Sequence, residues 1–71
     1  MTGNELLRKL KRLARKTKMA FEFDPSAGKG GHGEIRLGDR YTMLRSARQK
    51  EIPKGTLRAM LSQLGIDPRD I

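Results

Sequence analysis

The sequence predicts an α+β domain in which two helices cover one face of a three-stranded antiparallel sheet. Two observations carry this prediction: apolar residues recur at helical spacing near both ends of the 71-residue chain, and three segments between them alternate in polarity. Each helix needs an apolar surface and three strands bury one face, so two layers in a single domain, residues 1–71, are the economical arrangement. The opposite sheet face is left to solvent or to a ligand.

The first helix is expected over residues 4–16, because the apolar residues at positions 6, 7, 10, 13 and 14 share one helical face. Thr2 or Asn4 is the expected N-cap, and Glu5 suits the positive end of the helix. Basic residues fill the positions between the apolar ones: Arg8, Lys9, Lys11, Arg12, Arg15 and Lys16.

The first strand is expected over residues 19–24, where Met19, Phe21 and Phe23 recur with a period of two and Pro25 ends the pattern. Residues 25–33 (PSAGKGGHG) are predicted to be a loop by their glycine content.

Two further strands are expected to form a hairpin. Ile35 and Leu37 alternate with charged residues, and the turn signal Gly38-Asp39 leads into a segment of strand formers over residues 40–45. Two pairs of residues are expected on opposite faces of this last strand: Tyr41 with Met43, and Thr42 with Leu44.

The second helix is predicted to begin at Pro53, whose missing N–H costs nothing in a first turn. Apolar residues at positions 57, 60, 61 and 64 form a narrow stripe, Thr56 is a local capping residue, and Gly65 is the expected C-terminal stop.

The charge balance makes a polyanion the first partner to consider. Lys and Arg number 16 against 8 acidic residues, for a net charge of +8. RNA, DNA, an anionic membrane or an acidic protein would each fit. The absence of cysteine excludes disulfides, thiol catalysis and thiolate metal sites, and one histidine argues against a transition-metal site. No apolar run is long enough to span a bilayer and no secretory signal is evident, so we expect a cytoplasmic protein.

The excess positive charge is expected on the first helix and on the sheet with its loops, because the last 21 residues carry three cations and three acids. The first helix is therefore interpreted as a surface facing a polyanion, rather than as an ordinary solvated face. Since aromatic residues are scarce, phosphate contacts would supply most of the affinity, which should be salt-sensitive.

His32 is the candidate catalytic residue. It lies in the segment GKGGHGE, where glycine backbone amides can cradle an anion and Lys29 adds a charge. Histidine is suited to moving protons near neutral pH, and in RNA the proton to abstract is that of the ribose 2′-OH. The segment is not a P-loop, and the alternative is a surface histidine without a function.

Several segments together resemble the HicA family of toxins, which are mRNA interferases of toxin–antitoxin modules. They are Lys29-Gly30-Gly31-His32, the hairpin, the run E-I-P-K-G-T-L-R over residues 51–58, and the residues Leu61, Gln63, Gly65 and Ile66. The resemblance extends from Glu5 to Ile66 and is most specific in P-K-G-T-L-R. Its departures are Gly31 where the family usually has serine, Gly33 where the family often has a larger or polar residue, and a longer loop over residues 24–29.

The resemblance implies a fold similar to the double-stranded RNA-binding domain. It implies a type II toxin that cleaves mRNA without a metal or other cofactor in a stress response, with His32 as the single catalytic histidine, and that is neutralised by a HicB-type antitoxin. The candidate residues for holding RNA phosphates are Lys29, Gly30, Gly31, Arg36, Arg40, Arg45 and Arg48.

Other functions stay open at this point. A non-catalytic RNA-binding module could have the same fold, since fold does not determine function. A relative of the Gly-Gly-Gln loop of peptide release factors lacks its glutamine, and a DNA-binding protein would lack an evident helix-turn-helix. A second proton-transferring group is not evident; Lys29, Tyr41 and Arg36 are candidates only by their proximity in the expected hairpin.

Overall fold

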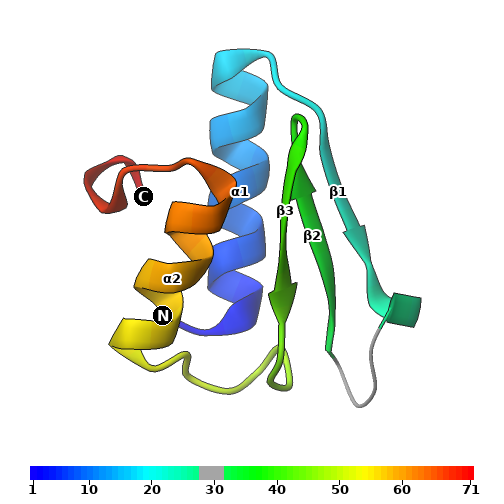
Figure 1. The fold of residues 1–71 in the computed structure, drawn as a ribbon, viewed down its shortest axis with the longest axis vertical. Coiled ribbons are helices and arrows are strands. Elements are labelled where there is room, and N and C mark those ends of the chain that lie inside the picture. Colours follow the sequence, from blue (N-terminus) through cyan, green and yellow to red (C-terminus); the bar gives the residue numbers. More distant parts are fainter. Residues whose placement is uncertain (28–31) are drawn as a thin grey trace.

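The computed structural model describes residues 1–27 and 32–71, and it confirms the predicted α+β fold. Helices α1 (Gly3–Thr17) and α2 (Lys54–Leu64) lie on one side of a sheet made of β1 (Phe21–Asp24), β2 (Gly33–Leu37) and β3 (Arg40–Leu44) (Figure 1). The strands are antiparallel in the order β1-β2-β3. Two short 3₁₀ helices, η1 (Pro25–Ala27) and η2 (Pro68–Asp70), complete the elements. No helix in the described ranges is long and apolar enough to cross a membrane.

Helix α1 begins with a capping box formed by Thr2 and Glu5. The Glu5 amide donates to the Thr2 hydroxyl at 3.2 Å, and the Thr2 amide donates to the Glu5 carboxylate at 3.0 Å. Thr2, rather than Asn4, is therefore the N-cap. The helix ends at Lys18, whose left-handed backbone lets its amide bond to the Ala14 carbonyl.

The first strand is shorter than predicted, because Met19 and Ala20 lie outside it. The Met19 amide bonds to the Ala14 carbonyl at 2.8 Å, which holds Met19 at the end of α1. Met19 is 41% exposed. It continues the period-two apolar pattern of the sequence, but it is not part of the strand. The end of the expected loop over residues 25–33 also differs, since Gly33 is the first residue of β2.

The hairpin and the two faces of β3 are as predicted. Leu37 pairs with Arg40 across the two-residue turn, and Gly38 adopts φ +62° at the first turn position, as a type II′ turn requires. Thr42 and Leu44 are buried under the helices, whereas Tyr41 is exposed on the other face. The buried Thr42 hydroxyl donates a hydrogen bond to the Gln63 side-chain oxygen of α2.

Helix α2 ends at Gly65 as predicted, but Thr56 does not cap it. Pro53 occupies the N-cap position and no side chain bonds to the first turn. Thr56 therefore lies inside the helix, with its side chain exposed. Gly65 adopts φ +73° and its amide bonds to the Leu61 and Ser62 carbonyls, which closes the helix.

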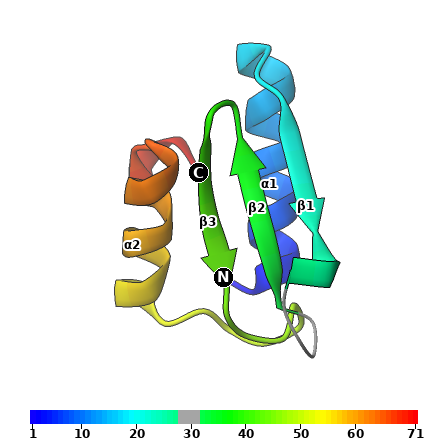
Figure 2. The same ribbon diagram turned by 45° about the vertical axis from the view of Figure 1, so that its right-hand side comes forward.

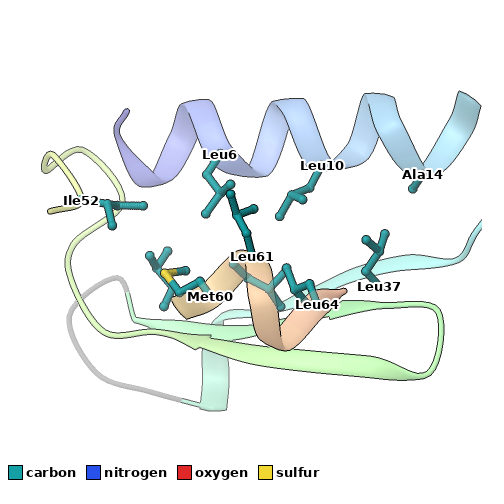
Figure 3. Packing of buried hydrophobic residues seen from close by; sticks show 10 residues of the cluster. Leu6, Leu10, Ala14, Leu37, Ile52, Met60, Leu61 and Leu64 are labelled. Carbon is teal, nitrogen blue, oxygen red and sulfur yellow. The ribbon is translucent and has the colours of Figure 1, made fainter. Parts of the chain in front are cut away.

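The core is formed where the two helices face the sheet (Figure 3). Its buried apolar residues come from α1, β2, β3, the connection to α2, and α2 itself: Leu6, Leu10, Ala14, Ile35, Leu37, Leu44, Ile52, Met60, Leu61 and Leu64. Ile52 is held in place because its amide bonds to the Met1 carbonyl at 2.9 Å. Nearby, the Asn4 amide bonds to the Arg48 carbonyl at 2.8 Å, so the start of α1 is tied to the segment before α2.

Candidate functional site

His32 lies at the end of the sheet where β2 begins. It is half-buried and directly precedes Gly33, which pairs with Leu44 at the end of β3. Arg45 follows Leu44 and is exposed. His32 and Arg45 are therefore the direct chain neighbours of the two members of one cross-strand pair, at the end of the sheet opposite the β2–β3 turn (Figure 2).

At this end of the sheet, both Gly33 and Arg48 contact the ring of Phe23. A Cβ added to Gly33 would lie 2.6 Å from two carbons of the ring and 2.8 Å from the Asp24 carbonyl oxygen. The Arg48 guanidinium lies over the same ring, 5.4 Å from its centre, a distance typical of a cation–π contact. Arg48 is thereby held close to the strand that begins next to His32.

Three predicted phosphate-binding residues, Lys29, Gly30 and Gly31, lie outside the described residues. The other four, which are Arg36, Arg40, Arg45 and Arg48, do not lie together. Arg45 and Arg48 lie at the His32 end, whereas Arg40 lies at the opposite end of β3, next to the turn. A Cβ on Gly65 would lie 3.0 Å from Arg40 Nε, so the Arg40 side chain packs against the C-terminal turn of α2.

Arg36 lies on the face of the sheet away from the helices and is already paired. Its Nε donates to the Glu34 carboxylate at 2.6 Å, and this hydrogen bond, followed by the Glu34 charge, raises the pKa of Arg36. The strand register puts Glu22 opposite Arg36, and Asp24 opposite Glu34, on the same face. This face thus carries three acids and one arginine, so the part of the expected positive excess assigned to the sheet is not found on its open face.

Of the three candidates for a second proton-transferring group, Lys29 lies outside the described residues, and Tyr41 and Arg36 are not next to His32. Tyr41 and Arg36 pair with each other, three residues along β2 from Gly33, which corresponds to about 10 Å. Among residues 1–27 and 32–71, no group of three or more acidic, histidine or cysteine side chains is placed to hold a metal ion.

The exposed side of α1 carries a row of four cations. Arg8, Lys11, Arg12 and Arg15 recur at helical spacing and line a shallow depression of about 260 Å³. We call these four residues the α1 basic ridge. The three ion pairs among the described residues involve Met1, Arg36 and Arg69, so none of them neutralises the ridge.

The sequence indicates a basic first helix, but the phosphate-binding residues predicted from it lie in the loop, the sheet and the segment after β3, and none lies on this ridge. The spacing i, i+3, i+4 and i+7 of its arginines and lysine was the signal that could have found it. Because α1 packs its apolar side on the sheet, these residues must share the opposite, solvent-facing side.

Comparison with known proteins found no matching family model, curated protein or solved structure.

Proposed function

We propose that this chain is an endoribonuclease that cleaves mRNA without a metal, using His32 as its proton-transferring residue. The proposal extends to the biological setting of the HicA-type toxins: the toxin of a type II toxin–antitoxin module, neutralised by a HicB-type antitoxin. The observation that carries it is the position of half-buried His32 at a sheet end that also holds Arg45 and Arg48. The helix and strand order agrees with the family resemblance.

In the proposed reaction, the His32 imidazole removes the proton of a ribose 2′-OH, whose oxygen then attacks the adjacent phosphorus. The bond from phosphorus to the 2′ oxygen forms and the bond to the 5′ oxygen breaks. The products are a 2′,3′-cyclic phosphate and a 5′-hydroxyl, whose proton comes from water, and the protonated His32 then gives its proton to the hydroxide left in the solvent. General base assistance of this kind contributes about 10²–10⁴-fold. Arg45 and Arg48 would stabilise the charge on the phosphate.

The basic ridge of α1 would hold the rest of the RNA through its phosphates. Its four cations lie on one helix face and have no acidic partner in the described part of the chain. Such contacts position a nucleic acid without reading its sequence, so they suit an enzyme or a binding module equally well. The alternative function is therefore a non-catalytic RNA-binding module that uses the same ridge.

The test compares the purified wild-type chain with His32→Ala on a single-stranded RNA in the presence of EDTA. We expect the wild type to produce fragments ending in a 2′,3′-cyclic phosphate, and we expect the variant to bind the RNA with unchanged affinity without cutting it. Arg69→Ala, prepared in the same way, serves as a control for contaminating nuclease, because Arg69 lies on η2 and pairs locally with Asp67.

Equal cutting by the wild type and His32→Ala would refute the assignment of His32. Salt-sensitive binding without cutting by either protein would favour the RNA-binding module. A growth assay extends the test to the toxin role: induced wild-type protein should arrest growth, and His32→Ala should not.

A further inference from the structure

The outer edge of β3 is open. The sheet order is β1-β2-β3, and in the described part of the chain no strand pairs with β3 on its other side. Because Leu37 and Arg40 close the two-residue turn, the backbone groups of Arg40, Thr42 and Leu44 face β2. The backbone N–H and C=O groups of Tyr41 and Met43 consequently face outward.

A groove of about 670 Å³ runs between this edge and α2, which lies alongside β3 (Figure 2). Between its ends, seven residues from the two elements line it: Tyr41, Thr42, Met43, Thr56, Ala59, Met60 and Gln63. Tyr41 is 60% exposed, although it is the only tyrosine of a chain that has no tryptophan. Methionine side chains are adaptable and often line surfaces that bind peptides.

The two ends of the groove are positively charged. Arg40 and Arg45 belong to its lining, and they are separated by five residue steps, or about 17 Å of extended chain. Neither arginine takes part in an ion pair among the described residues. Asp39, beyond Arg40 at the turn, is the single acid of the lining.

We propose that this groove binds an extended segment of a partner protein, which adds to β3 as a fourth strand and directs one carboxylate to Arg40 and another to Arg45. The outward backbone groups of Tyr41 and Met43 would supply the hydrogen bonds, and the exposed side chains would supply specificity. This surface differs from the basic ridge of α1, and the proposal does not depend on catalysis by His32.

The charge pattern favours a peptide over the alternatives. A nucleic acid needs cations at close intervals along its backbone, and the groove has them only at its ends. A second copy of β3 would bring one carboxylate, that of Asp39, together with two more arginines, so its charge does not complement the two positive ends. An acidic, extended peptide satisfies both the charged ends and the backbone edge.

A blocked peptide with the sequence Glu-Val-Thr-Val-Thr-Glu is a suitable probe, and Lys-Val-Thr-Val-Thr-Lys is its control. We expect saturable changes in Tyr41 fluorescence and an affinity about tenfold or more higher for the acidic peptide. Hydrogen exchange of the Tyr41 and Met43 amides should slow when the acidic peptide is bound. Equal affinities, or binding that leaves these two amides unchanged, would overturn the proposal.

Two substitutions separate backbone pairing from charge. Met43→Pro removes an outward N–H at an edge position, where proline is tolerated, and should weaken binding by about tenfold or more, whereas Met43→Val should bind normally. If Met43→Pro unfolds the domain, Arg45→Glu still decides the matter. It should favour a peptide with lysine at one end only, and the preferred end reveals the direction of the added strand.

A competing outcome concerns RNA. If a single-stranded oligoribonucleotide perturbs the Tyr41 and Met43 amides of His32→Ala while the acidic peptide does not, the groove is an RNA surface and the proposal is wrong. If the chain self-associates and Met43→Pro abolishes that association, the occupant is a second copy, which also refutes it.

Discussion

At the residue scale, Gly33 determines how closely β1 and β2 approach at the His32 end. The Phe23 ring occupies the space that a side chain at this position would need, and the Arg48 guanidinium lies over the same ring. The glycine that departs from the family pattern is therefore explained by a local contact: a larger residue after His32 would displace Phe23 and with it Arg48.

We predict that Gly33→Ala lowers the free energy of unfolding by about 1–3 kcal/mol, because its Cβ would lie 2.6 Å from the Phe23 ring. Gly55→Ala is the matched control: its Cβ meets nothing within 4 Å, and alanine in a helix should stabilise by about 0.5–1 kcal/mol. Urea unfolding of both variants would test this. Equal effects of the two substitutions would contradict the predicted contact.

At the scale of the element, the beginning of α1 depends on Thr2. Its hydroxyl accepts from the Glu5 amide, and the Glu5 carboxylate accepts in return from the Thr2 amide. The hydrogen bonds from the backbone and side chain of Thr2 lower the pKa of Glu5 below its ordinary value of 4.5. Similar hydrogen bonds from Ser26 lower the pKa of Asp24, and those from Arg69 lower the pKa of Asp67, below 3.8.

These directions predict a loss of stability in acid. A carboxylate whose pKa is lowered by folding stabilises the folded state above its unfolded pKa, and this contribution disappears as the pH falls through the folded value. We therefore expect stability to be constant near neutral pH and to decline once the pH falls below about 4.5, the ordinary value for Glu5.

Thr2→Ala should lower the free energy of unfolding at neutral pH by about 1 kcal/mol and should make its decline in acid less steep. Thr17→Ala provides a control at the other end of the helix, where the hydroxyl donates to the Leu13 carbonyl and caps no amide. Thermal unfolding between neutral and strongly acidic pH measures both effects. An acid decline as steep in Thr2→Ala as in the wild type would show that the capping box does not contribute to it.

At the scale of the whole molecule, the charge is divided between two sides. The basic ridge of α1 lies on the outside of the helical layer, while the open face of the sheet carries Glu22, Asp24 and Glu34 around Arg36. A polyanion should therefore approach the molecule from the α1 side. The net charge of +8 does not show this difference between the two sides, because it sums over the whole chain.

Replacing Arg8, Arg12 and Arg15 together by glutamine should lower the magnitude of the salt dependence of RNA binding by about 2 in log–log slope, if each arginine contacts a phosphate of single-stranded RNA. The control removes Lys54, Arg58 and Arg69, which are three cations outside the ridge. Both triple variants are measured in the His32→Ala background so that the RNA stays intact. Equal slopes for the two would contradict a role for the ridge.

The sequence predicted the helices and strands better than it predicted where they end and which residues from other segments bond to them. Both helices and the faces of β3 followed from periodicity, because burial imposes that spacing directly. The start of β1 was wrong because the end of α1 uses the Met19 amide, and Ile52 was missed because its burial depends on a bond to Met1.

The candidate site was predictable only in part, because some of its contacts depend on how distant segments pair. His32 and the arginines at its end of the sheet were identified from residue types and the family pattern. The pairing of Arg36 with Glu34 and its acidic neighbours across β1 depends on the strand register, which residue types alone do not specify.

The bonds between the first residues of α1 and the segment before α2 also affect how the protein is made. Gly3 and Asn4 bond to the carbonyls of Lys50 and Arg48, and Ile52 closes the core from the same segment. During synthesis, these two amides of the first turn find their partners only after more than forty further residues have been added. A nascent chain that ends before Ile52 lacks α2 and the core residues that α2 supplies, so prematurely terminated products should not fold stably.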